Sequence, residues 1–163
     1  ILLLLGGFIL SMALAKNNAH LRIALGMVRL FGQNSKRGLV FGFMVAAASL
    51  SMWISNTATT LMLLPVALAI LDSSGDKKLV VPLLLGIAYA ASVGGIGTPI
   101  GTPPNLIFMK VYGDVTGQEL GFTSWMKWGV PVVVIFVPII ALWLTRNLSG
   151  KGTYTLPEHT SLF

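Results

Sequence analysis

The stretch WISNTATTLMLLP, residues 53–65, decides the fold of this chain. It brings five hydrogen-bonding side chains into a run that carries no charge from Gly38 to Leu71. The five are Ser55, Asn56, Thr57, Thr59 and Thr60. Side chains of Ser, Asn and Thr compete with the backbone for hydrogen bonds, so they favour helix caps and turns over helix interiors. The sequence therefore predicts a break at Ser55-Asn56-Thr57, in the middle of the run.

The length of this run limits how it can sit in a membrane. Its 34 residues would form a single helix roughly 50 Å long, whereas the hydrocarbon core of a bilayer is only about 30 Å thick. Two complete spans would need about 40 residues and a turn. We therefore expect a re-entrant helical hairpin over residues 38–71, with the Ser-Asn-Thr break at its tip. A single helix with a polar kink is the alternative.

Composition sets the class of protein. The 163 residues are 55% hydrophobic and only 10% charged, which predicts an all-α integral membrane protein. The net charge of +6 does not indicate nucleic-acid binding, because the basic residues are sparse and lie between the apolar runs. The absence of cysteine excludes disulfides and thiolate metal sites. Because the chain opens within an apolar run, we expect it to be a fragment of a longer multi-pass protein.

The charge pattern predicts the order of segments along the chain. Five basic residues and no acid precede the hairpin, which marks the cytoplasmic side of a cell (plasma) membrane protein. The expected segments are the end of a transmembrane helix (1–15), an interfacial arm helix (16–37), the re-entrant hairpin (38–71), a broken transmembrane helix (79–112), an outer loop (113–127), a transmembrane helix (128–146) and a polar cytoplasmic linker (147–163). For the arm segment, a short helical connector is an equally good interpretation.

A second break is predicted in SVGGIGTPIGTPPNLIF, residues 92–108. Four glycines and three prolines cannot continue a helix, so this discontinuous helix is expected to unwind near its middle. Pro103 suits the first turn of a new helix, where its missing N–H is no loss. The segment is not a phosphate-binding loop, because the Gly-Lys-Ser/Thr ending and the preceding strand are missing.

Two broken membrane segments in one chain indicate the binding site of a transporter. The helix ends at each break direct carbonyl groups toward a cation and N–H groups toward an anion. Ser, Asn and Thr can then bind ligands without a permanent charge in the bilayer. The simpler interpretation, that such residues bond back to their own helix, is better for Ser49, Ser51 or Thr60 taken singly. At the predicted break, beside a second Gly- and Pro-rich break, we favour ligand binding.

The two motifs SMWISNTATTLMLLP and GIAYAASVGGIGTPIGTPPNLIF resemble the divalent anion:sodium symporter family. The resemblance implies a secondary active transporter that carries di- or tricarboxylates such as succinate, with sodium as the coupling ion and no other cofactor. It also implies the site residues. The substrate would bind to Ser55, Asn56, Thr57, Thr102 and Pro103, and sodium to Ser51, Ser55, Asn56 and Gly101.

The resemblance further implies an inverted-repeat architecture. Family members contain two such repeats, and this chain contains one, so half of the substrate site is expected from a missing second repeat. The partners implied are a small dicarboxylate or related divalent anion, Na⁺, the lipid bilayer and a second copy in a homodimer. Transport would follow an elevator-like motion of the domain that carries the hairpin.

Two other functions remain open from the sequence. A sodium-independent carboxylate exchanger is the nearest alternative, and a channel with re-entrant half-helices is the alternative from another class. An enzyme is not expected, because neither broken run contains Asp, Glu, His, Lys or Cys for acid–base or nucleophilic chemistry.

Overall fold

The computed structural model describes residues 35–148 and five isolated residues before them, which are Gly6, Ile9, Ala13, Gly26 and Leu30. The segment predicted for 1–15, most of the arm predicted for 16–37 and most of the linker predicted for 147–163 lie outside the described residues. Residues 35–148 form helices and turns without a strand. The helices are α3 (Lys36–Ser51), α4 (Asn56–Ser74), α5 (Lys77–Gly94), α6 (Pro103–Thr116) and α7 (Phe122–Thr145).

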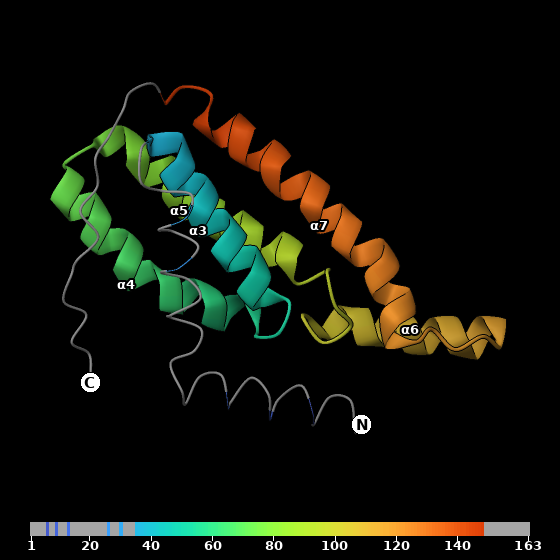
Figure 1. Ribbon diagram of the computed structural model, residues 1–163. Coiled ribbons are helices and arrows are strands. Elements are labelled where there is room, and N and C mark those ends of the chain that lie inside the picture. Colours follow the sequence, from blue (N-terminus) through green and yellow to red (C-terminus); the bar gives the residue numbers. More distant parts are fainter. Residues whose placement is uncertain are drawn as a thin grey trace.

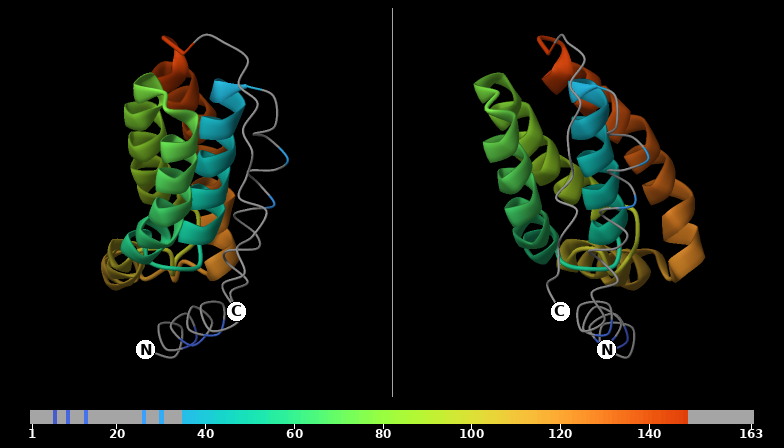
Figure 2. Two further views of the ribbon diagram at one scale, coloured as in Figure 1. Left: turned by 90° about the vertical axis from the view of Figure 1, so that its left-hand side faces the viewer. Right: turned by 60° about the vertical axis from the view of Figure 1, so that its left-hand side comes forward.

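Four of these helices lie side by side, and α6 crosses one end of them (Figures 1 and 2). Helix α3 packs most extensively on α5, with α4 and α7 on either side of this pair. Helices α3 and α4 run antiparallel and are joined by the turn at 52–55. The non-helical turn lies at 52–55, so it includes Ser55 of the predicted break, whereas Asn56 and Thr57 already belong to α4. Two separate helices replace the kinked single helix considered above.

Small residues allow the central helices to approach closely. The buried face of α3 includes Ala46, Ala47 and Ala48, and α5 presents Ala91 and Gly94. A Cβ atom added to Gly94 would lie 2.5 Å from the Cα atom of Ala48, so this crossing tolerates no side chain at position 94. Close backbone packing of this kind is typical of helices in membranes. No hydrophobic force drives them together there, and small residues allow the van der Waals contacts that do.

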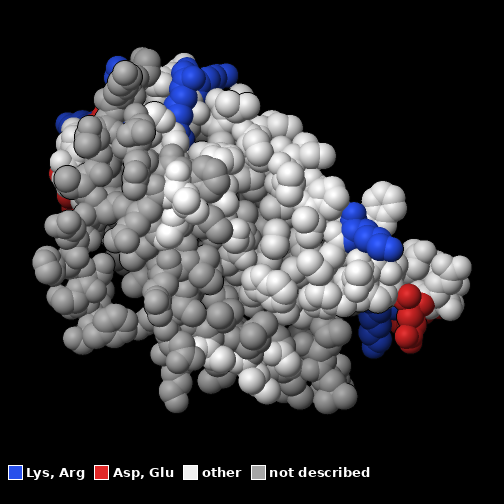
Figure 3. All heavy atoms as spheres, viewed as in Figure 1, with Lys and Arg blue, Asp and Glu red and all other residues white. Residues whose placement is uncertain are grey.

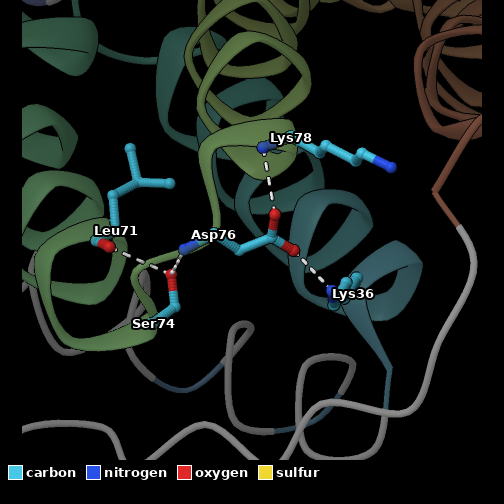
Figure 4. Close-up of polar contacts among 5 residues, drawn as sticks. All are labelled: Lys36, Leu71, Ser74, Asp76 and Lys78. Carbon is cyan, nitrogen blue, oxygen red and sulfur yellow. Dashed lines mark hydrogen bonds and ion pairs between the residues drawn. The ribbon is translucent and has the colours of Figure 1, made fainter.

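Polar contacts hold one end of the helix bundle together. Lys36 at the start of α3 forms an ion pair with Asp76, which also caps α5 by accepting a 3.0 Å hydrogen bond from the N–H of Lys78 (Figure 4). These two hydrogen bonds, from Lys36 first and Lys78 second, lower the pKa of the Asp76 carboxyl below its ordinary value. The Arg37 guanidinium donates to the Leu148 carbonyl at 2.8 Å. The outer ends of α3, α4, α5 and α7 therefore meet at one end, which we call the charged end.

The exposed surface is that of an integral membrane protein. Helices α4, α5 and α7 are long and apolar enough to cross a membrane. Helix α7 exposes a continuous set of large apolar side chains, including Val134, Ile135, Phe136, Ile139 and Leu142. On the face seen in Figure 3, the charged side chains gather at the two ends and leave an uncharged band between them.

The helices on either side of the predicted outer loop (113–127) extend beyond the charge-free runs from which they were predicted. Helix α6 continues to Thr116, and α7 begins at Phe122 and includes Lys127. Lys127 is exposed, and long basic side chains are compatible with a helix near the membrane surface because they extend to water. Only residues 117–121 are left between the two helices.

Candidate functional site

The turn at 52–55 ends one helix and caps the next. The Ser55 side chain caps α4 by accepting a 3.3 Å hydrogen bond from the N–H of Ala58, and its carbonyl accepts from the N–H of Thr59 at 2.9 Å. Within residues 35–148, no hydrogen bond is found for the N–H groups of Asn56 and Thr57. The start of α4 therefore keeps the N–H groups of Asn56 and Thr57 as free donors, which is the normal state of a helix N-terminus that meets water or a ligand.

The second break folds into a compact loop of residues 95–102, which we call the α5–α6 loop. Helix α5 ends at Gly94, and the first turns of the loop continue with hydrogen bonds from Ile96 to Val93 (3.1 Å) and from Gly97 to Gly94 (2.9 Å). Gly101 N–H then donates to the Thr98 carbonyl at 3.3 Å. The loop thus turns back on itself before α6 begins at Pro103.

Close backbone contacts join the loop to the hairpin turn. A Cβ atom added to Gly101 would lie 2.5 Å from the Gly95 carbonyl oxygen and 2.9 Å from the Ser51 carbonyl oxygen. One added to Gly95 would lie 2.7 Å from Oδ1 of Asn56. Ser51, Asn56, Gly95 and Gly101 therefore surround a single point, although they are distant in sequence. No hydrogen bond to the Ser51 carbonyl is found within residues 35–148.

Two acceptors compete for the Ser51 hydroxyl proton. The hydroxyl oxygen lies 2.7 Å from the Ala91 carbonyl and 2.5 Å from Oδ1 of Asn56. A hydroxyl group has one hydrogen to donate, so it cannot satisfy both oxygens. Oxygen atoms of Ser51, Ala91 and Asn56 thus lie close together, which is an arrangement suited to a cation.

The structure brings together only some of the residues predicted for sodium and substrate. It brings Ser51, Asn56 and Gly101 together, with Ser51 and Gly101 buried and Asn56 half-buried. Ser55, the fourth residue assigned to sodium, is exposed as the cap of α4. Among the other residues predicted for substrate, Thr57 and Pro103 are exposed and Thr102 is half-buried. Among the described residues, no hydrogen bond links Ser55, Asn56 or Thr57 to Thr102 or Pro103.

The start of α6 offers fewer donors than a helix N-terminus usually does. Pro103 and Pro104 have no N–H, and the N–H of Asn105 already donates to the Thr102 carbonyl at 3.1 Å. The Thr102 side chain makes no capping hydrogen bond. What α6 can offer an anion is therefore the Thr102 hydroxyl and the positive end of the helix dipole.

Several residues of the site were not predicted as binding residues from the sequence. Gly95 contributes a carbonyl, Thr98 donates to the Met52 carbonyl, and Trp125 donates from its indole N–H to the Ile96 carbonyl at 2.8 Å. Asn105, in the first turn of α6, donates to the carbonyls of Gly95 and Thr98, both at 2.8 Å. Of these residues, only Gly95 could have been found from the sequence, because two adjacent glycines, Gly94 and Gly95, indicate a close approach of backbones.

The site is electrically neutral. No Asp, Glu, Lys, Arg or His occurs from 38 to 71 or from 79 to 109, and no group of three or more His, Cys, Asp or Glu that could hold a metal ion is present in the described part of the chain. Any ion here must bind to carbonyl, hydroxyl and amide groups. Hard cations such as Na⁺ and Ca²⁺ prefer oxygen ligands of this kind.

One buried hydroxyl near the site has no partner. Thr59 is fully buried on the inner face of α4, one turn beyond Asn56, and in the described residues its Oγ1 is the only buried side-chain polar atom without a hydrogen bond. An unsatisfied buried hydroxyl costs about 1–3 kcal/mol. Thr98 is buried to the same degree, but its hydroxyl is bonded.

The long apolar helices are those of an integral membrane protein, and the uncharged site lies between the turn at 52–55 and the α5–α6 loop. Comparison with known protein families identifies the family to which the chain belongs. Residues 1–155 match the citrate transporter (CitMHS) family, and the chain belongs to this family. This confirms the resemblance predicted from the two motifs, and it places the chain among transporters and not among enzymes.

Named relatives give the same result. The chain is 37% identical to the sodium-dependent dicarboxylate transporter SdcS of Staphylococcus saprophyticus over 168 residues, which cover 96% of this chain and 32% of the relative. It is 39% identical to the protein of the same name from Staphylococcus aureus over 155 residues, or 88% of this chain and 30% of the relative. The chain thus spans about a third of the length of the curated relatives that it matches.

Proposed function

We propose that this chain forms one half of a transporter that couples the uptake of a small di- or tricarboxylate, such as succinate, to the entry of sodium. The observation that carries the proposal is the convergence of Ser51, Asn56 and Gly101 at one uncharged point between two helix breaks. The names of the relatives, sodium-dependent dicarboxylate transporters, supply the substrate class and the coupling ion.

Sodium binds on the side of the site where oxygen acceptors gather. The Ser51 carbonyl lies at the C-terminal end of α3, where the helix dipole is negative. Asn56 adds its amide oxygen, and Gly101 adds its own carbonyl from the α5–α6 loop. A cation that takes Asn56 Oδ1 as a ligand also ends the competition for the Ser51 proton, so that the Ser51 hydroxyl can donate to the Ala91 carbonyl alone. Ser55 completes this set in our assignment.

The carboxylate binds on the exposed side of the same site. The start of α4 offers the free N–H groups of Asn56 and Thr57 and the hydroxyl groups of Ser55 and Thr57. It is also the positive end of the helix dipole, which favours anions. Thr102 and Pro103 border this region from the loop. Because no basic side chain takes part, bound sodium supplies the positive charge that a dicarboxylate requires.

The length of α3 supports a re-entrant hairpin whose tip lies within the bilayer, whereas α4, with 19 residues, is by itself long enough to cross it. Helix α3 has 16 residues and is about 24 Å long, shorter than a bilayer core of about 30 Å. Helix α7 has 24 residues, or about 36 Å, and it meets the α5–α6 loop at Gly129, where a Cβ atom would lie 2.6 Å from the Ile96 carbonyl. The distance along α7 from Thr145, at the charged end, to Gly129 is also about 24 Å. The α5–α6 loop therefore lies about as far from the charged end as the turn at the end of α3.

The hairpin topology predicts that both flanks of residues 38–71 lie on the cytoplasmic side. The Lys36–Asp76 ion pair already holds these flanks together. Single cysteines at the exposed positions Arg37 and Lys77 should both react with an impermeant reagent applied from the cytoplasmic side. A cysteine at the exposed Glu119, beyond α6, should react only from the opposite side. Reaction of positions 37 and 77 from opposite sides would show that the segment spans the membrane.

The remaining parts of the transporter can be inferred from the repeat that this chain contains. A second, inverted repeat would bring its own Ser-Asn-Thr hairpin to complete the substrate site, and two such proteins would form a homodimer in the cell membrane. Helices α3 to α7 would move as one body in an elevator-like step, with the bilayer around them. The α5–α6 loop is the unwound part of the discontinuous helix 79–112.

Sodium coupling is tested by the reciprocity of binding. When succinate is titrated calorimetrically into the purified full-length transporter, its affinity should be at least about tenfold higher in sodium than in choline, because neutral donors alone compensate the two negative charges poorly. Sodium should gain the same factor from saturating succinate, since coupling free energies are reciprocal. Equal succinate affinity in sodium and choline would overturn the symport proposal and favour the sodium-independent exchanger.

A further inference from the structure

Four backbone carbonyls around the site are held by side chains that the proposed binding set does not include. Thr98 donates from its hydroxyl to the Met52 carbonyl in the hairpin turn. Asn105, in the first turn of α6, uses its amide nitrogen on the carbonyls of Gly95 and Thr98, at 2.8 Å each. Trp125, in α7, donates to the Ile96 carbonyl at 2.8 Å. The three donors thus come from the loop itself and from two different helices.

These bonds fix the peptide groups next to the proposed sodium ligands. Met52 follows Ser51 directly, so the bond from Thr98 sets the distance between the hairpin turn and the α5–α6 loop. The bond from Asn105 fixes the Gly95 carbonyl, which lies against Gly101. Thr98 and Asn105 are 0% and 7% exposed, so water does not replace either donor if it is removed.

Trp125 secures the loop from outside. Its bond to Ile96 lies one turn from Gly129, where α7 touches the carbonyls of Ile96 and Gly97 so closely that no side chain fits. Trp125 lies near the start of α7 and is half-buried. In the structure its N–H faces the protein, and the indole group fastens α7 to the loop.

We propose that Thr98, Asn105 and Trp125 are positioning residues that set the sodium affinity and the preference for sodium over lithium, by holding the carbonyls of the hairpin turn and the α5–α6 loop in place. This inference rests on the proposed sodium site at Ser51, Asn56 and Gly101. None of the three side chains binds the ion. A cage of fixed oxygens favours the cation that fits its size, whereas a loosened cage accepts the smaller lithium ion more easily.

The test uses matched substitutions in the full-length transporter in proteoliposomes. Thr98→Val keeps the shape and removes the donor, and Thr98→Ser keeps the donor. Thr59→Val makes the same chemical change at a buried threonine whose hydroxyl has no partner. The measured quantities are the sodium concentration that gives half-maximal succinate uptake, and the ratio of uptake in lithium to uptake in sodium.

Thr98→Val should raise the half-maximal sodium concentration about five- to tenfold, the equivalent of one net hydrogen bond, and should raise the lithium-to-sodium ratio. Thr98→Ser and Thr59→Val should match the wild type in both quantities. Trp125→Phe, at a half-buried position where folding is less at risk, should shift both quantities in the same direction as Thr98→Val.

Other outcomes would overturn the inference. It is wrong if Thr98→Val or Trp125→Phe leaves both quantities unchanged, or if Thr59→Val changes them as much as Thr98→Val, since the effect would then be one of packing. A wild type whose uptake does not depend on sodium would overturn the proposed function and this inference together. Sodium-dependent uptake with unchanged Thr98→Val and Trp125→Phe variants would overturn the inference alone.

Discussion

Gly101→Ala in the full-length transporter should reduce sodium-coupled succinate uptake about a hundredfold. The new Cβ atom would lie 2.5 Å from the Gly95 carbonyl oxygen and 2.9 Å from the Ser51 carbonyl oxygen. Both are backbone atoms and cannot rotate away as a flexible side chain would. Because Gly101 has no positive φ, the backbone itself permits alanine, and the effect isolates the lack of space. A displacement of about 1 Å of groups that position a ligand costs roughly this factor.

Gly113→Ala is the matched control for this prediction. It is the same substitution in α6, but the nearest atom to the added Cβ is the Gln118 carbonyl oxygen at 3.7 Å, an ordinary contact. Alanine is favoured over glycine within a helix by about 1 kcal/mol, so this variant should transport normally. Radiolabelled uptake in proteoliposomes at several sodium concentrations measures both variants. Normal sodium-coupled uptake by Gly101→Ala would show that the ion binds elsewhere.

Asn56→Ala should lower the apparent sodium affinity by roughly ten- to a hundredfold, the value of a lost hydrogen-bonding group that interacts with a charge. Asn56 Oδ1 lies beside the Ser51 hydroxyl and Gly95, where the proposed cation would bind. The cap of α4 is Ser55 and not Asn56, so the helix start survives the substitution. The loss should therefore appear in sodium binding, while the thermal stability of the ion-free protein in detergent changes little.

Ser92→Ala is the control for Asn56→Ala. Ser92 is exposed on α5 close to the loop, and its hydroxyl donates only to the Ala88 carbonyl of its own helix, at 3.1 Å. Its replacement should leave the half-maximal sodium concentration unchanged. If Asn56→Ala behaves like Ser92→Ala in a sodium titration of succinate uptake, then Asn56 serves the turn alone.

The positions of the two breaks were predictable because they depend on local chemistry. Helix α3 ends at Ser51 and α4 begins at Asn56, so the turn lies just before the predicted place and shares Ser55 with it, because Ser55 caps α4. Helix α5 ends at Gly94, and α6 begins at Pro103, where a proline suits the first turn. Hydropathy also settled the class of protein, since three helices are long and apolar enough to cross a membrane. These properties follow from residues that are neighbours in the chain.

Only the tertiary structure decided how the breaks meet. Ser51 and Gly101 are 50 positions apart in the sequence, and they touch because small residues, above all Gly94 against Ala48, let α5 pack on α3 at one particular level. The same packing decides that Thr98, Asn105 and Trp125 donate to backbone carbonyls, whereas Thr59, which is as buried as Thr98, does not. Residue types and their spacing specify where a helix can begin or end, because those preferences are local. They do not specify which backbone groups of distant segments face each other, because that depends on how the side chains between the helices fill space.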